Sequence, residues 1–231
     1  MQIHNYFKTG GFHTYRGEEC QDEVLWTTVG SYDIAVLADG VSECSHGKRG
    51  AQLACEAVVD FIRMEKENVF LYTPRKLSYL VIEHILYFIE MESFQNGTAV
   101  CDYASTIAFI CVDNKTGKMI TFSLGDGAIF HSSGPDVHTV AEPRRYYGNP
   151  GLTTTKDAYK YVEVQNLPIS IGDSVLLCTD GFMHAIGYNN ACRSVLQEAM
   201  LKQGLSELDI LLNNTNEPDD ISYIHYTRTR R

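Results

Sequence analysis

Residues 34–40, Ile34-Ala35-Val36-Leu37-Ala38-Asp39-Gly40, run from an unbroken apolar stretch into an aspartate and a glycine. An apolar run of this length predicts a buried strand, so the aspartate at its end emerges at the rim of a sheet. The glycine lets another group approach the backbone closely. The same pattern recurs in Ile120-Thr121-Phe122-Ser123-Leu124-Gly125-Asp126-Gly127 and in Val175-Leu176-Leu177-Cys178-Thr179-Asp180-Gly181.

A fourth acidic pair, Asp219-Asp220, opens the apolar run from Ile221 to Tyr226. If the four strand ends meet, several negative charges share one small volume, and carboxylates avoid that repulsion only by protonation or by binding cations. Hard divalent ions favour oxygen ligands, so the pattern predicts a metal site. Asp-Gly is also a strong hairpin signal, and a turn between paired strands is the alternative for any single copy.

Length and composition fit a compact globular domain. The chain has 231 residues, is 44% hydrophobic and carries a formal net charge of −10. No linker interrupts it, so we expect one domain over residues 1–231. The negative charge argues against a nucleic-acid partner. Residues 1–7 lack a secretory signal, and no run reaches the roughly 18 apolar residues of a membrane span. We therefore expect a cytoplasmic protein with no membrane partner.

Several other classes of site lack their signatures. The seven cysteines show no CxxC or Cys/His spacing of a zinc site. Cys55, Cys111 and Cys178 lie in apolar stretches and are expected to be reduced core residues. No G-x-S-x-G elbow, Walker loop or G-x-G-x-x-G fingerprint is present, which argues against the common serine hydrolases and nucleotide-binding proteins.

Hydrophobic periodicity predicts an α+β order of elements. A helix begins at Thr73-Pro74, an N-cap followed by proline, and ends near Gly97. His84 lies on its apolar stripe and is expected to be a hydrogen-bonded core residue. An earlier helix has Ala54, Ala57, Val58, Phe61 and Ile62 on one buried face.

Strands and short helices complete this order. Strands 104–112, 118–124 and 127–132 are expected to be neighbours joined by turns. A polar, turn-rich stretch, 132–156, follows them. The other expected elements are strands near 24–29, 33–38, 160–164, 173–178 and 221–227, and short helices at 181–186, 191–203 and 205–213.

Taken together, these motifs resemble the metal-dependent Ser/Thr phosphatases of the protein phosphatase 2C type, particularly their compact bacterial branch. The resemblance covers nearly the whole chain and depends on the shared order of motifs that are each short. The matching stretches are Gly11-Phe12-His13 through Cys20-Gln21-Asp22, Ala38-Asp39-Gly40-Val41-Ser42, Gly50-Ala51, Ala104-Ser105-Thr106, Gly125-Asp126-Gly127-Ala128, Tyr147-Gly148-Asn149 with Thr153, Thr179-Asp180-Gly181 and Asp219-Asp220-Ile221-Ser222.

The resemblance implies a four-layer α-β-β-α sandwich, with two antiparallel sheets flanked by helices and a dinuclear Mg2+ or Mn2+ centre at one end. Asp39 would bridge both metals, Asp126 would serve a third, weaker metal, and Asp220 would support its neighbours. The implied metal ligands are Asp22, Asp39, the Gly40 carbonyl, Asp126, Asp180 and Asp219.

The resemblance also implies an activity. Hydrolysis of a phosphate monoester needs a nucleophile at neutral pH and neutralisation of charge on the phosphoryl group, and a pair of metals supplies both. We therefore expect a phosphoprotein phosphatase in which a water bridging two metals attacks phosphoserine or phosphothreonine. Its partner would be an opposing Ser/Thr kinase or that kinase's targets. A catalytic Cys20 is a minor alternative.

Two features depart from the family pattern. Many relatives have a histidine directly after the Asp-Gly, where this chain has Val41. The arginine that binds substrate phosphate should lie upstream of Asp22, and Arg16 is the candidate, with His13 as its rival; each could instead be a surface or turn residue. A catalytically inactive module of the same fold that binds a phosphoprotein or regulatory partner is therefore the alternative function. Segment 132–156 could act as a substrate-gating flap.

The residues just after the Asp39 loop have two interpretations. They could contact an anionic substrate or form a solvated helix start. These residues are His46, Lys48 and Arg49.

Overall fold

The protein is described by a computed structural model that covers all residues except 147, 188–195, 197–198, 201–203 and 231. The described strands form two antiparallel five-stranded sheets and a short hairpin. Sheet A consists, in spatial order, of β1 (Gln2–Lys8), β12 (Ile221–Thr227), β11 (Ser174–Cys178), β6 (Ala128–Ser133) and β7 (Asp136–Ala141). Sheet B consists of β10 (Glu163–Pro168), β5 (Lys118–Leu124), β4 (Ile107–Asp113), β3 (Tyr32–Ala38) and β2 (Glu23–Val29).

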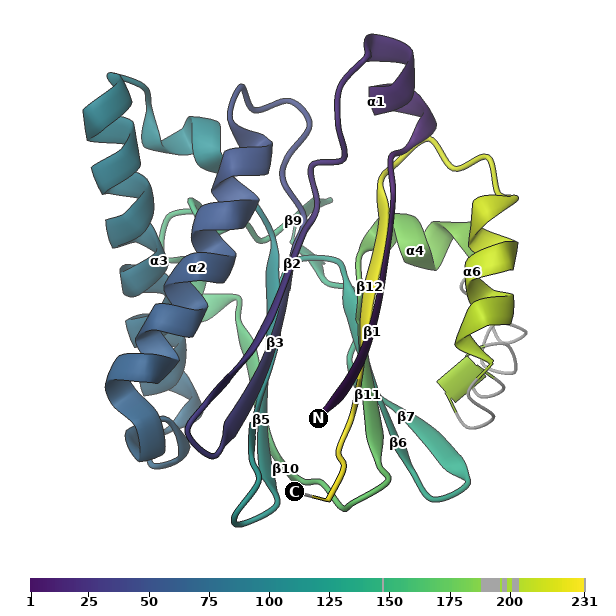
Figure 1. The fold of residues 1–231 in the computed structure, drawn as a ribbon. Helices are drawn as coiled ribbons and strands as arrows, with labels where there is room; N and C mark the ends of the chain where they lie inside the picture. The colour runs from purple at the N-terminus through teal and green to yellow at the C-terminus, as the bar shows by residue number, and fades with distance from the viewer. Residues whose placement is uncertain (147, 188–195, 197–198, 201–203, 231) are drawn as a thin grey trace.

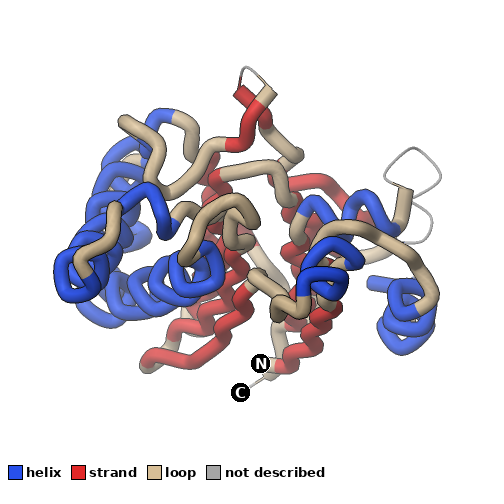
Figure 2. Tube along the Cα trace, turned by 90° about the horizontal axis from the view of Figure 1, so that it is seen from above, coloured by secondary structure: helices blue, strands red, loops and turns tan. Residues whose placement is uncertain are grey.

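The two sheets lie face to face, and helices cover their outer faces (Figure 1). Figure 2 shows the same layers from above, with helices on both sides of the strands. The helices are α1 (Gly11–Arg16), α2 (Gly47–Glu65), α3 (Pro74–Asn96), α4 (Asp180–Ala185) and α6 (Leu205–Asn213). Short 3-10 turns are η1 (Lys66–Phe70), η2 (Val100–Tyr103) and η3 (Ala158–Lys160), and the hairpin is β8 (Arg145–Tyr146) with β9 (Asn149–Pro150). This architecture confirms the predicted α-β-β-α sandwich.

Strand β3 shows why its sequence is apolar without alternation. Ile34, Val36 and Ala38 pack into the core that sheet B shares with α2 and α3. Ala35 and Leu37 point the other way, into the core between the two sheets. A third core lies between sheet A and helices α4 and α6. Because residues 34–38 of β3 are buried on both faces, each of these positions favours an apolar side chain.

Helix α3 confirms its predicted boundaries. The Thr73 hydroxyl accepts a hydrogen bond from the Lys76 amide, and Pro74 occupies the first turn. Gly97 ends the helix in the left-handed conformation, at φ 66°. His84 Nε2 lies 3.1 Å from Asp60 Oδ2 on α2, so this histidine is hydrogen-bonded between two helices as expected, although it is part-buried and not in the core.

Strand β1 was not predicted from the sequence. It is an edge strand that pairs antiparallel with β12, and Tyr6 is its only buried residue. A strand with so little burial has no clear apolar pattern, and the pairing with a segment more than 200 residues away supplies its structure.

One prediction about the middle of the chain was wrong. Strands β5 and β6 are not neighbours, because residues 125–127 carry the chain from sheet B to sheet A. Gly125, at φ 125°, has a conformation that glycine adopts readily. The polar, turn-rich stretch 132–156 also contains β7 and the β8–β9 hairpin.

Other predictions fared differently. The expected strand near 160–164 lies at Glu163–Pro168, and most of the expected helix 191–203 falls outside the described residues. The three cysteines expected in the core, Cys55, Cys111 and Cys178, are buried. No helix in the described ranges is long and apolar enough to span a bilayer. That residues 1–231 form one domain stays a prediction.

Candidate metal centre

The pairing of β2 with β3 brings the first two aspartates together. Glu23 lies opposite Ala38 in this antiparallel register. Asp22 precedes Glu23 and Asp39 follows Ala38, so the two carboxylates lie at the same end of sheet B. The Asp39 amide donates to Thr106 Oγ1 at 3.1 Å, and the Thr106 amide donates to the Asp39 carbonyl at 2.8 Å. These bonds fix the end of β3 against the neighbouring strand.

Sheet A supplies the other carboxylates in the same way. Cys178 of β11 lies opposite Tyr223 of β12 and Ala128 of β6. The segments just beyond this row carry the remaining predicted ligands, Asp126, Asp180 and Asp219. We call these three, together with Asp22 and Asp39, the carboxylate site.

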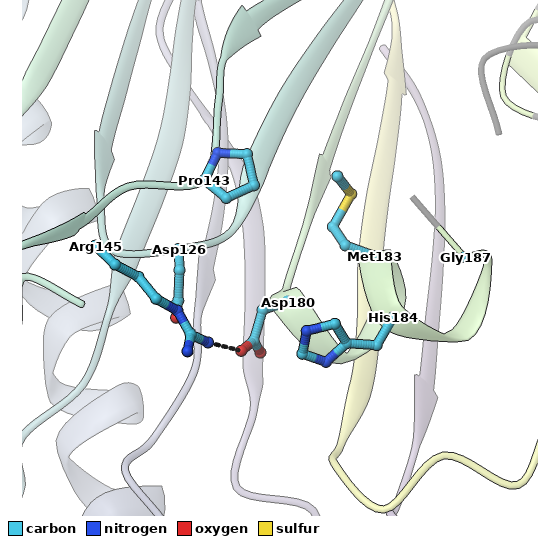
Figure 3. Close-up of a pocket in the computed structure, with 7 residues that line it drawn as sticks. All are labelled: Asp126, Pro143, Arg145, Asp180, Met183, His184 and Gly187. Atoms are coloured by element: carbon cyan, nitrogen blue, oxygen red, sulfur yellow. Dashed lines mark hydrogen bonds and ion pairs between the residues drawn. The ribbon is translucent and has the colours of Figure 1, made fainter. Parts of the chain in front are cut away.

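The carboxylate site borders two adjoining hollows. One, of about 450 Å3, is lined by Asp39, Asp126, Asp180 and Asp219, with Gly40 and Val41 beside them. The second, of about 460 Å3, shares Asp126, Arg145 and Asp180 with it (Figure 3). Asp22 lies behind this surface and is fully buried.

Burial shapes the electrostatics of the site. It is the main cause that raises the pKa of Asp22 to about 7 and that of Asp180 to about 6. Burial, with the charges of Asp22 and Asp180, raises the pKa of Asp39 well above its usual range. Burial also raises the pKa of Asp219. Carboxylates held this way are costly as bare anions and are stabilised by a cation.

The donor set fits a hard divalent ion. Both carboxylate oxygens of Asp22 and Oδ1 of Asp180 are buried without a hydrogen-bond partner. Such orphaned oxygens are groups that a cation would satisfy, and an all-oxygen set suits Mg2+ or Mn2+. In the part of the chain that the structure describes, no three His, Cys, Asp or Glu side chains are already arranged to hold an ion.

Gly40 has the close backbone approach that the sequence predicted. A Cβ placed on it would lie 2.5 Å from the Gly47 carbonyl group and 2.9 Å from the Gln21 carbonyl oxygen. The start of α2 therefore packs directly on the backbone that follows Asp39. Lys48 strengthens this contact, because its Nζ donates to the Asp22 carbonyl at 2.6 Å and lies 3.0 Å from Glu23 Oε2.

Asp220 supports the site from inside the protein. Its Oδ1 accepts from the Gly10 amide at 2.7 Å, and its Oδ2 accepts from the Gln21 amide at 2.6 Å. Nδ1 of the buried His13 lies 2.9 Å from Oδ2. Asp220 thus links the segment that carries Asp22 to the start of β12. This is the supporting role that the sequence predicted.

The predicted phosphate-binding residues do not line either hollow. His13 is buried against Asp220, and the Arg16 guanidinium lies 4.0 Å from the centre of the Phe12 ring. Their role in substrate binding stays a prediction, and this arrangement gives it no support. His46 stacks on Tyr103 at 4.9 Å, and Arg49 pairs with Glu92 at 3.1 Å, as in a structural helix start.

Arg145 is the residue that sequence reasoning missed. Its Nη2 lies 2.8 Å from Asp126 Oδ2 and 3.2 Å from Asp180 Oδ2 (Figure 3). It belongs to the β8–β9 hairpin, inside the polar, turn-rich stretch 132–156. No apolar pattern or motif marks it, so only the fold brings it to the carboxylates.

Solved structures with the same fold share little sequence with this chain. The catalytic domain of the Ser/Thr protein phosphatase PstP, in complex with two manganese ions, is 14% identical, with a TM-score of 0.74 over 99% of this chain and 98% of that one. The phosphatase Stp1 from Staphylococcus aureus is 12% identical, with a TM-score of 0.72 over 99% and 95%. RsbX, in complex with magnesium, is 15% identical, with a TM-score of 0.65 over 97% and 93%.

A family model gives the more direct assignment. No curated protein matches the chain. The model described as protein phosphatase 2C matches residues 9–208, which include every strand end discussed above except Asp219-Asp220. Strand order, the carboxylate site and this match agree. The chain therefore belongs to the protein phosphatase 2C family.

Proposed function

We propose that this protein is a metal-dependent protein phosphatase that hydrolyses phosphoserine and phosphothreonine. The observation that carries the proposal is the carboxylate site, in which acidic side chains from both sheets meet with raised pKa values and unpartnered oxygens. A site of this kind is unfavourable unless cations bind. The manganese of PstP and the magnesium of RsbX support the choice of metal.

Each predicted ligand would have its own role in holding the metals. Asp39 would bridge two metals, with Asp22 and the Gly40 carbonyl on one; Asp180 and Asp219 would hold the other. Asp126 would serve a third, weaker site. Two bound divalent ions supply a water nucleophile at neutral pH and neutralise charge on the phosphoryl group. The chain's own part is to fix these oxygens on strand ends of two rigid sheets.

The nucleophile need not come from the protein. Burial raises the pKa of the Cys20 thiol, and the charges of Asp22 and Asp220 raise it further. A thiol in such surroundings stays protonated and is a poor nucleophile. The structure therefore lends no support to the cysteine alternative, and hydrolysis by water remains the proposal.

The alternative function is an inactive module that binds a phosphoprotein or regulatory partner. Val41 favours it, because this residue lines the hollow where many relatives carry a histidine. The retained carboxylates favour the enzyme, since a module without metal chemistry has no evident use for mutually repelling groups. As partners of the enzyme we propose phosphoproteins, an opposing Ser/Thr kinase or that kinase's targets.

The test compares hydrolysis of p-nitrophenyl phosphate and of a phosphothreonine peptide in Mn2+, Mg2+ or excess EDTA. Wild type should turn over only with metal. Asp39→Asn should lose nearly all turnover while its circular dichroism stays that of wild type. Asp136→Asn, an exposed position on β7 away from the site, is the matched control and should keep full activity. Folded wild type that is inactive with every metal would favour the binding module.

A further inference from the structure

Arg145 places a guanidinium at the carboxylate site. Its Nη2 lies 2.8 Å from Asp126 Oδ2 and 3.2 Å from Asp180 Oδ2, and about half of the side chain is exposed. Among the described residues that line the two hollows, it is the only arginine or lysine. The β8–β9 hairpin that carries it also contributes Asn149 and Pro150 to the first hollow.

Other basic side chains near this end of the molecule already have partners elsewhere. Lys48 pairs with Glu23 and Arg144 with Glu163 at 2.9 Å. Arg16 lies over Phe12. His184, which lines the second hollow, has Nδ1 3.8 Å from Glu217 Oε1. Among the described residues that line the first hollow, Arg145 is therefore the basic side chain that an anion can contact.

Charge favours such a cation. The five carboxylates of the site carry up to five negative charges and the two main divalent ions carry four positive ones, so a phosphate dianion would still be repelled until the weaker third site is filled. A guanidinium presents planar, forked donors that match phosphate oxygens and form charge-assisted hydrogen bonds. Its exposure leaves it free to turn from the carboxylates to a ligand in the hollow.

We propose that Arg145 binds the phosphoryl group of the substrate, and that in the metal-free protein it rests on Asp126 and Asp180 as an internal counter-cation. Divalent cations that take over these carboxylates would release the guanidinium to the hollow. The inference rests on the proposed phosphatase function and adds to it the residue that receives the substrate's anion. It gives Arg145 the role that the sequence alone assigned to Arg16 or His13.

The test uses inorganic phosphate as the probe and calorimetry as the readout, on full-length protein loaded with Mn2+. Arg145→Gln should weaken phosphate binding about 10- to 100-fold, the loss expected for a charge-assisted hydrogen bond. Arg145→Lys should recover part of it. Arg144→Gln, the adjacent arginine that pairs with Glu163 outside both hollows, is the matched control and should bind phosphate like wild type.

A second titration separates substrate binding from metal binding. Metal-depleted Arg145→Gln should bind Mn2+ at least as tightly as wild type, because the competing cation is gone. Unchanged phosphate affinity in Arg145→Gln, an equal loss in Arg144→Gln, a loss explained by weaker Mn2+ binding, or no phosphate binding by wild type would each overturn the inference. Phosphate binding through Arg145 without turnover in any metal would uphold Arg145 as the residue that binds phosphate and reject the phosphatase proposal.

Discussion

Two adjacent aspartates, Asp219 and Asp220, have different roles: the first is a candidate metal ligand and the second supports the structure. The Asp219 side chain lines the first hollow, and burial raises its pKa. The Asp220 side chain points inward and accepts amide hydrogen bonds at both oxygens. Asp219 accepts one amide hydrogen bond, from Asp220 to its Oδ1 at 2.9 Å. An oxygen that already has an amide donor is poorly available to a metal. Amide bonds at both oxygens therefore mark Asp220 as the structural carboxylate, whereas Asp219 keeps its Oδ2 for a metal.

This difference predicts unequal effects on stability. Asp220→Ala leaves the buried Gly10 amide and the part-buried Gln21 amide without this acceptor and should lower the free energy of unfolding by about 2–4 kcal/mol. Asp219→Ala removes one part-buried amide bond but also a carboxylate held at a raised pKa, so it should destabilise the metal-free protein much less. Urea unfolding in EDTA measures both. Equal destabilisation by the two variants would contradict this division of roles.

At the scale of the element, the start of α2 is set by backbone contact with the neighbouring loop and η2. A Cβ on Gly50 would lie 2.1 Å from the Tyr103 carbonyl oxygen. His46, at the N-cap, donates its amide to the Asp102 carbonyl at 3.0 Å. The helix therefore fits against η2 only with glycine at this position, and the contact holds the loop after Asp39 in place.

Gly50→Ala tests this packing, because the contact predicts that the substitution destabilises the protein. In an exposed helix interior, replacing glycine with alanine stabilises a protein by about 0.5–1 kcal/mol. Here the added methyl group meets backbone, and the helix must shift, at a cost of about 1–3 kcal/mol. We expect a lower midpoint in urea and weaker Mn2+ binding measured by calorimetry. A variant more stable than wild type would show that α2 can move freely.

The sequence predicted those elements that are determined by residues close together along the chain. The apolar run of β3 and the Thr73-Pro74 start of α3 each depend on neighbouring residues only, and both were confirmed. Strand β1 and Arg145 depend on contacts with distant segments, so no local pattern could reveal them. The crossing at residues 125–127 looked like a hairpin because Asp-Gly suits both a turn and a strand end.

At the scale of the whole molecule, the carboxylate site joins the two sheets. Asp22 and Asp39 end strands of sheet B, while Asp126, Asp180 and Asp219 flank strands of sheet A. Folding therefore brings these charges together, and the unfolded chain keeps them apart. Without metal, the repulsion between these carboxylates lowers the free energy of unfolding, and metal binding should raise it again.

The final prediction measures that cost through pH. A carboxyl group with a raised pKa, such as Asp22 at about 7, binds more protons in the folded than in the unfolded state. The metal-free fold therefore loses stability as pH rises from about 4 through 7. The buried His225, whose pKa is lowered to about 4, opposes this trend, so the quantity to measure is the difference in stability between Asp22→Asn and wild type.

In EDTA, the melting temperature of Asp22→Asn should exceed that of wild type. The difference should grow from pH 5.5 to 8, by about 2–4 °C for each kcal/mol of stability. Saturating Mn2+ should reverse the order at pH 8, and a margin independent of pH would contradict the burial of an ionising Asp22.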